Sequence, residues 1–237
     1  MLLGWALAAW IGGSFVSCVV ADVLLRPVLH DAATRYYLLH AIVNAAVCVL
    51  IYDDCVRFLR DPLAGLDGPY SDGALAMTVG LHLFHCASQA KTLTAVDWAH
   101  HLVSNMLVSG LCFPFNFGPL QNWACLFVCG LPGGIDYALL FLVKLGKLSK
   151  AREKSINRFL NMWIRLPGIL SFVPFAYCCH AVGRTSVGPG LLTLQAVLNS
   201  VNAIYFADRV VANAATHALK SKEAAAGAKD AYPVKDE

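Results

Sequence analysis

Long stretches without charged residues alternate with short polar segments along this chain. Asp, Glu, Lys and Arg are all missing from residues 1–21, 36–52, 73–90, 98–135, 166–183 and 185–207. The fourth stretch is interrupted by Pro114–Pro119 and is long enough for two crossings of a bilayer, each of which takes roughly 20 residues. The pattern therefore predicts seven transmembrane helices and an all-α, polytopic membrane bundle.

The composition agrees with this pattern. Hydrophobic residues make up 58% of the 237 residues, charged residues only 14%, and the mean hydropathy is +0.59. A soluble domain carries roughly 25% charged residues, so a soluble domain is excluded. The chain reads as one transmembrane domain over residues 1–215, followed by a polar tail over 216–237 that we expect to be disordered. We expect no nucleic-acid partner.

The basic residues predict the orientation. With seven spans, fifteen of the 18 Lys and Arg residues fall on the side that holds the C-terminus. The positive-inside rule then places the C-terminus in the cytosol and the N-terminus in a lumen or outside the cell. The first apolar stretch lacks the basic start of a signal peptide, so we interpret it as the first span.

The seven spans are expected at 2–25, 35–52, 73–91, 94–113, 120–147, 167–180 and 189–209. Residues 147–165 are strongly basic and predict a cytosolic connector. Within the fifth span, the segment 130–134 contains Pro132 between glycines, and a proline removes one helical hydrogen bond. We therefore expect a kink or an unwound turn there.

Polar residues inside the spans mark the candidate site. Asp97 precedes the adjacent pair His100 and His101 by three and four residues, which places it on the same helical face as both. His82 and His85 lie one turn apart in the preceding span and can reach the same depth. Buried polar groups at such depth usually face a cavity and serve function. The candidate catalytic residues are His100, His101 and Asp97, and the candidate substrate-binding residues are Asp136, His82, His85, Asn105, Asn199 and Asn202.

This set suits proton or acyl transfer, because a neutral imidazole acts as base or transient acyl carrier and a carboxylate one turn away orients it. An interhelical polar network is the structural alternative. Di-iron histidine boxes are absent, the nine cysteines show no metal spacing, and we expect no metal or other cofactor, although a zinc site from His82, His85 and His100 stays open. A retinal protein is excluded because no lysine occurs between Lys154 and Lys220.

Two segments resemble the TLC-domain family, which includes the ceramide synthases. These segments are Asp97–His101, with the sequence DWAHH, and Gly130–Tyr137, with the sequence GLPGGIDY; the resemblance extends over about residues 35–210. It implies a multi-span protein of the endoplasmic reticulum that synthesises, senses or distributes lipids, with the double histidine as the reactive element. Asp136 and Lys144 resemble the second half of the ceramide synthase motif.

The chain departs from the ceramide synthases in two respects. The His-Asp expected in the motif is replaced around Leu131 and Pro132, and there is no homeobox-like insert. The chain is therefore more similar to the shorter TLC-domain proteins that are not synthases.

The leading hypothesis is a protein of lipid handling, acting on membrane lipid composition and on sphingolipid or acyl-lipid homeostasis. The first alternative is an acyl-CoA-dependent N-acyltransferase, for which acyl-CoA would be the co-substrate. The second is a transporter or trafficking receptor, because a broken helix beside a buried acid is typical of transporters. Membrane lipids are the expected partners in each case, and a homodimer stays open.

Overall fold

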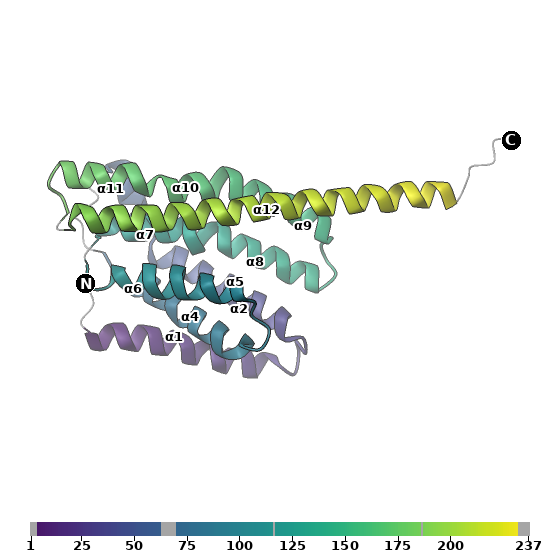
Figure 1. Cartoon of the computed structure of the whole chain (residues 1–237). Helices are drawn as coiled ribbons and strands as arrows, with labels where there is room; N and C mark the ends of the chain where they lie inside the picture. The colour runs from purple at the N-terminus through teal and green to yellow at the C-terminus, as the bar shows by residue number, and fades with distance from the viewer. Residues whose placement is uncertain (1–3, 63–69, 116, 186, 232–237) are drawn as a thin grey trace.

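The structure is a computed structural model that describes residues 4–62, 70–115, 117–185 and 187–231, without the side chains of 104, 105 and 224–231. Every regular element in this part of the chain is a helix, which confirms the all-α prediction (Figure 1). In chain order the elements are α1 (Gly4–Leu25), α2 (Ala32–Leu50), α3 (Tyr52–Arg60), α4 (Gly73–Gln89), α5 (Ala95–His100), η2 (His101–Val108), α6 (Ser109–Cys112), α7 (Pro119–Cys125), η3 (Leu126–Gly130), α8 (Leu131–Lys144), α9 (Lys150–Leu160), η4 (Asn161–Arg165), α10 (Leu166–Leu170), α11 (Phe172–Ala181) and α12 (Pro189–Ala231).

Local sequence signals set the helix ends. Thr94 caps α5 in a capping box, because its side chain accepts from the backbone N–H of Asp97 while Asp97 accepts from the backbone of Thr94. Gly146 follows the end of α8 with a φ of 68°, a conformation that glycine adopts without strain. Its N–H bonds to the carbonyl of Val143, and the N–H of Lys147 bonds to that of Leu142. This pair of bonds is a Schellman motif, which satisfies the last carbonyls of the helix.

Three helical runs contain a π-helical segment, and two of these segments precede the same tripeptide. η3 leads into Leu131-Pro132-Gly133, and η4 leads into Leu166-Pro167-Gly168. A proline inside a helix lacks an N–H and clashes with the carbonyl four residues earlier. A wider π turn before it lets the chain stay helical. The break expected at residues 130–134 takes this form rather than that of an unwound turn.

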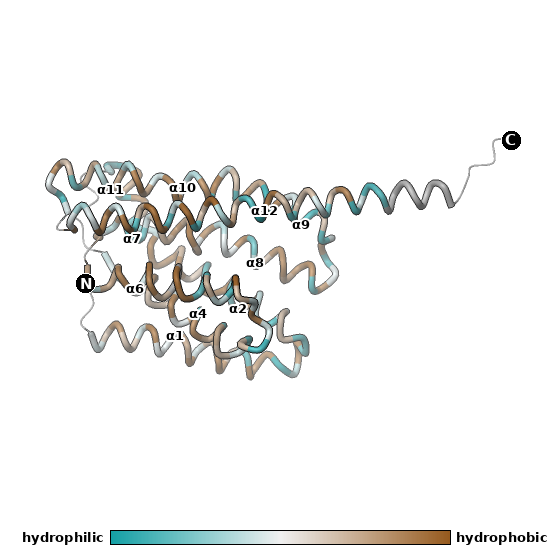
Figure 2. The backbone as a smooth tube through the Cα atoms, in the orientation of Figure 1, coloured by the Kyte–Doolittle hydropathy of each residue, from teal (hydrophilic) through white to brown (hydrophobic). Residues whose placement is uncertain are grey.

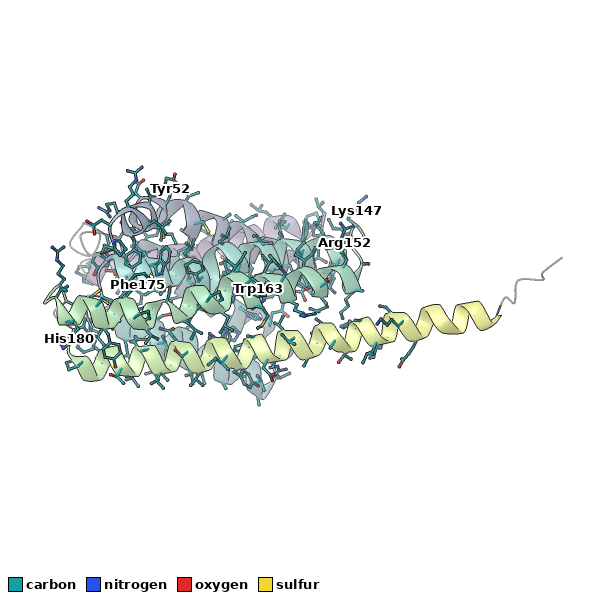
Figure 3. All side chains as sticks on the ribbon, turned by 90° about the horizontal axis from the view of Figure 1, so that it is seen from above. Tyr52, Lys147, Arg152, Trp163, Phe175 and His180 are labelled. Carbon is teal, nitrogen blue, oxygen red and sulfur yellow. The ribbon has the colours of Figure 1, made fainter. Side chains whose placement is uncertain are left out.

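Among the described residues, five helical segments are long and apolar enough to cross a membrane. They are Gly4–Leu25, Ala32–Leu50, Pro119–Lys144, Lys150–Ala181 and Pro189–Glu223. Large apolar side chains on them are exposed, including Trp5 at 91% and Trp163 at 72%, and Trp163 lies midway along its helical run in Figure 3. Exposed apolar surface of this extent is unusual in water. The features are those of an integral membrane protein.

The other two predicted spans are shorter or less apolar. The third corresponds to α4, which has 17 residues, and the fourth to the run from α5 through η2 to α6. The count of seven spans therefore stays a prediction.

The helices form a bundle in which α4 is central. It packs along α1 and α2, α2 packs along α8, and α12 packs along α9 and α10 (Figure 1). At Gly80 of α4 a Cβ atom would lie 2.5 Å from the carbonyl oxygen of Ile11 and 2.7 Å from Cβ of Ser14. The absence of a side chain at Gly80 is thus what allows α1 and α4 to approach so closely.

The two ends of the bundle differ in character. Tyr52 and His180 mark one end in Figure 3, and Lys147 and Arg152 mark the other, from which α12 projects. Figure 2 shows hydrophobic residues along α1, α6 and α10, and hydrophilic ones near the turn from α8 into α9.

An aromatic core joins α3, α7 and α11. The ring of Phe58 lies 4.9 Å from that of Trp123 and 4.7 Å from that of Phe175, measured between centroids. Nε1 of Trp123 donates a 2.9 Å hydrogen bond to Oγ of Ser171. Phe58 is 1% exposed, so this cluster is a close-packed hydrophobic core.

Two sequence-based expectations are corrected here. The predicted connector over 147–165 is not separate from the sixth predicted span, because α9 and η4 belong to the same long helical run as α10 and α11. The predicted disordered tail is helical as far as Ala231, and residues 232–237 lie outside the described part. The tail is rich in alanine, which has the highest helix propensity, and this outweighs its polarity.

Candidate functional site: a histidine-lined cavity

Five histidine rings from three segments of the chain face one another inside the bundle. His40 lies on α2, His82 and His85 lie on α4, and His100 and His101 lie where α5 continues into η2. The ring centroid of His101 is 4.6 Å from that of His85 and 5.4 Å from that of His82. The ring centroid of His40 is 5.6 Å from the ring centroid of His85. The pairs predicted in neighbouring spans are therefore brought together.

These rings line a cavity of about 310 Å³. Most of the helices contribute to its wall, and all three π-helical segments do. The lining residues are Tyr36, His40, Asn44, His82, His85, Asp97, His100, His101, Val128, Cys129, Gly133, Asp136, Tyr137, Arg165, Ile169, Asn202, Ala203, Phe206 and Val210.

Backbone carbonyls fix the protonation of two of the rings. Nδ1 of His40 lies 3.0 Å from the carbonyl oxygen of Tyr36, and Nδ1 of His82 lies 2.8 Å from that of Thr78. A carbonyl oxygen only accepts, so each Nδ1 donates its proton in this bond. In the neutral ring the remaining nitrogen, Nε2, then carries a free lone pair. At Nε2, both neutral rings can therefore accept a proton or bind a metal ion, but they cannot donate a hydrogen bond from that atom.

Two tyrosines connect α2, α4 and α8. The hydroxyl of Tyr36 lies 3.1 Å from Nδ1 of His85 and 3.1 Å from the hydroxyl of Tyr137. The ring of Tyr36 is also 4.0 Å from that of His40, between centroids. This hydrogen-bonded chain can pass a proton between the histidines and α8 without a displacement of the backbone.

A buried polar row on α9 and η4 ends at the cavity. Glu153, Asn157, Asn161 and Arg165 recur every four residues and share one helical face. Nδ2 of Asn157 donates to Oε1 of Glu153 at 3.5 Å, Nδ2 of Asn161 donates to the carbonyl oxygen of Asn157 at 2.9 Å, and Nη1 of Arg165 donates to Oδ1 of Asn161 at 3.0 Å. Glu153 is 0% exposed. The hydrogen bonds within the row offset the cost of burying these side chains.

The charges around Asp136 offset one another. Asp136 lines the cavity and interacts electrostatically with Arg165, Glu153 and Lys154. Nζ of Lys154 pairs with Oε2 of Glu153 at 3.1 Å. Two acids and two bases therefore balance in this corner of the bundle, which reduces the cost of burying them. Oδ1 of Asp136 and Nε of Arg165 are buried and have no hydrogen-bond partner among the described residues, so the hydrogen-bonding capacity of both atoms is unused there.

Asp97 lines the cavity and interacts electrostatically with His100 and His101, and its carboxylate also caps α5. Its carboxylate oxygen Oδ2 accepts from the backbone N–H of Thr94 at 2.9 Å and from Oγ1 of Thr94 at 2.7 Å. The hydrogen bonds of Asp97 that the structure gives thus cap α5, whereas the sequence led us to expect a carboxylate that orients His100 or His101.

The resemblance also singled out Lys144, which lies elsewhere. Its Nζ pairs with Oδ2 of Asp31 at 3.2 Å, and it is not among the residues that line the cavity. The hydrogen bond from Thr34 and the pairing with Lys144 lower the pKa of Asp31 to about 2. Lys144 therefore belongs to the contact between α8 and the turn before α2.

Two of the three predicted asparagines line neighbouring spaces. Asn202 lines the histidine cavity and lies within hydrogen-bond reach of His100. Asn199 and Asn202 together line a smaller, mostly apolar cavity of about 60 Å³, and Asn199 does not reach the histidine cavity. Asn105 lies on η2, and its side chain is outside the described part of the structure.

An apolar groove adjoins the histidine cavity on the α12 side. It has a volume of about 320 Å³ and lies between α5, η2 and α12. His100, Asn202 and Phe206 line both spaces. The polar cavity and the apolar groove therefore share one boundary.

Sequence reasoning missed several residues of the cavity. His40 and Asn44 lie one helical turn apart in the second predicted span, and this polar spacing was the signal that could have placed His40 in the site. Arg165 was assigned to the connector over 147–165 because a charged residue in a span is rare. Tyr36 gave no signal, because tyrosine is common near the ends of membrane helices, and Tyr137 was noted only as the end of the segment that resembles the TLC-domain family.

No protein-family model, curated protein or solved structure matches the chain. The fold and the site themselves define its class. It is a helical protein of the membrane type, with five candidate spans in the part of the chain that the structure describes and an internal cavity lined by histidines and by charged residues.

Proposed function

We propose that this protein binds a membrane lipid, with the polar headgroup in the histidine cavity and an acyl chain in the adjoining groove. The observation that supports this is the boundary that His100, Asn202 and Phe206 share between the two spaces. A lipid has the same division into a polar and an apolar part. Lipid handling of the TLC-domain type, in the endoplasmic reticulum, is the role that we infer.

The groups in the cavity favour a headgroup with both donors and acceptors. Arg165 offers a cation, Asp136 offers an anion, and the imidazoles offer nitrogen donors or acceptors. A sphingoid-type headgroup, with an amine and hydroxyls, satisfies such a set. The exposed apolar side chains along the groove give the acyl chain a surface that is continuous with lipid.

The proposed orientation keeps the C-terminus in the cytosol. Lys147 and Arg152 lie at the end of the bundle from which α12 projects (Figure 3), and α12 itself carries Lys220 and Lys222 there. Basic residues concentrate on the cytosolic side of membrane proteins.

The test is to identify what the purified protein retains. Lipids extracted from the full chain in nanodiscs are analysed by mass spectrometry, and the same is done for Val201→Trp, which fills the groove. Val197→Trp is the matched control. Val197 is exposed on the same helix one turn away, but of these two valines only Val201 lines the groove. We expect one lipid class to be enriched in the wild type and in Val197→Trp and to be lost in Val201→Trp. Equal retention by both variants would refute the proposal.

A second candidate function is acyl transfer from acyl-CoA to an amine. It is favoured by the nitrogens Nδ1 of His100 and His101, which are buried and have no hydrogen-bond partner among the described residues. One of these rings would act as base or as transient acyl carrier. The assay incubates the purified protein with a sphingoid base and labelled acyl-CoA, and an N-acyl product that disappears in His100→Ala and His101→Ala supports it. Lipid retention without product leaves binding as the function.

A further inference from the structure

Three imidazoles in the cavity converge on one point. One ring nitrogen each of His82, His100 and His101 lies within 4.8 Å of the others. Ligand nitrogens around a tetrahedral zinc ion are about 3.3 Å apart, given zinc–nitrogen bonds of 2.0–2.1 Å. The nitrogens would have to approach one another by up to about 1.5 Å to bind one zinc ion.

His100 and His101 lie where α5 passes into the π-helical segment η2. The two rings lie 5.5 Å apart between centroids, and His82 of α4 completes the set from the opposite side.

The hydrogen bond of His82 prepares it as a ligand. Its Nδ1 donates to the carbonyl oxygen of Thr78 at 2.8 Å, so the neutral ring directs its lone pair from Nε2. Histidines that bind metals nearly always donate their second N–H to a carbonyl or carboxylate in this way. His101 is 4% exposed, and its Nδ1 has no hydrogen-bond partner among the described residues.

We propose that His82, His100 and His101 bind a divalent transition-metal ion, with zinc as the ion that suits three imidazoles best. Three protein ligands leave the fourth position of a tetrahedral ion open, as in reactive zinc sites. Asp97 lines the same cavity and interacts electrostatically with His100 and His101, so its negative charge lies close to the converging rings. The site departs from the sequence-based expectation of no metal, because only the fold brings α4 against η2.

The function of such an ion rests on the proposed lipid binding. An oxygen atom of the headgroup, from a hydroxyl, carboxylate or phosphate, fits the open position. The metal would then hold the headgroup at the boundary between cavity and groove, where His100 lies.

The test measures metal directly. The full chain is purified in nanodiscs with a tag that contains no histidine, stripped with a chelator, dialysed against Zn²⁺ and analysed by mass spectrometry for zinc. His82→Gln and His101→Gln each remove one ligand. His85→Gln is the matched control, because His85 lines the same cavity but does not belong to the converging set. All variants are first checked for folding by size exclusion and circular dichroism.

We expect about one zinc per chain in the wild type and in His85→Gln. In the two ligand variants the dissociation constant should rise by more than about a hundredfold, beyond the effect of outer-shell changes. If a variant does not fold, X-ray absorption of the zinc-loaded wild type gives the answer, because three imidazoles at about 2.0 Å produce a distinct scattering pattern.

Substoichiometric zinc in the wild type, or equal loss in His85→Gln and His101→Gln, would overturn the metal site. The lipid measurement separates this from the proposed function. If the protein binds zinc but retains no lipid, the metal site is supported and the proposed lipid binding is refuted. If it retains a lipid but binds no zinc, lipid binding is supported and the metal site is refuted.

Discussion

The contact between Gly168 and Phe127 offers the sharpest test of the packing around the cavity. A Cβ atom at Gly168 would lie 2.6 Å from Cε1 of Phe127 and closer still to Cγ and Cδ1 of the same ring. Carbon atoms in contact are separated by about 3.5–4.0 Å, so the ring would have to move by about 1 Å or more. Gly168 belongs to α10 and Phe127 to η3, and both segments contribute to the cavity wall through Ile169 and Val128.

The expected effect of Gly168→Ala follows from two opposing terms. Overpacking of this kind costs typically 1–3 kcal/mol, and the overlap with three ring atoms places it near the upper value. Alanine gains about 1 kcal/mol over glycine in a helix. We therefore expect a net loss of about 2 kcal/mol in the free energy of unfolding.

The assay compares unfolding of the purified variants in nanodiscs. Gly110→Ala is the matched control, because Gly110 is helical and nothing lies within 4 Å of a Cβ there; it should be neutral or slightly stabilising. Phe127→Ala combined with Gly168→Ala should show a large coupling energy, because the smaller side chain removes the overlap. Gly168→Ala as stable as Gly110→Ala would refute the reasoning.

Three further predictions concern other parts of the molecule. Gly80→Leu should separate α1 from α4 and lower the yield of folded protein, since a Cβ there already meets the backbone of α1; unchanged thermal stability would contradict this. Trp123→Phe removes the hydrogen bond to Ser171 and leaves a void in the aromatic core, so it should cost more than the roughly 1 kcal/mol of one hydrogen bond; Ser171→Ala in the Trp123→Phe background should cost about 1 kcal/mol further, because Oγ of Ser171 also donates to the carbonyl oxygen of Gly168, and no loss of unfolding free energy in Trp123→Phe would contradict this. Asp31 has a lowered folded pKa of about 2, so its stabilisation is complete above about pH 4 and is lost as the pH falls through 2. Asp31→Asn keeps the cap of α2 and should lack this loss in acid unfolding; parallel curves for the two proteins would argue against it.

The two Leu-Pro-Gly segments show what sequence can and cannot indicate. Pro132 correctly marked an interruption of the fifth span, because a proline cannot complete the helical hydrogen bonds. Whether the chain unwinds, kinks or forms a π turn depends on the neighbouring helices. Gly133 approaches Asn44 of α2 so closely that a Cβ atom on Gly133 would lie 3.0 Å from Nδ2 of Asn44, and that contact is a property of the bundle.

The sequence by itself determined the class of the protein and its helices. Long uncharged stretches predict membrane helices because an unpaired charge in hydrocarbon is costly. The same rule gave no indication that Glu153 is buried in the bundle or that Arg165 lines its cavity, since it scores each residue alone. In the bundle a hydrogen-bonded row of asparagines joins them, and paired charges offset the cost of burial.

The tertiary structure alone decided which histidines meet. His82 and His101 belong to different helices, and no spacing along the chain indicates that their rings are 5.4 Å apart. The same holds for His40, which joins the cavity because α2 packs against α4. Helix formation depends on local hydrogen bonds and hydropathy, which a sequence displays, whereas the cavity depends on the packing of side chains between helices, which it does not.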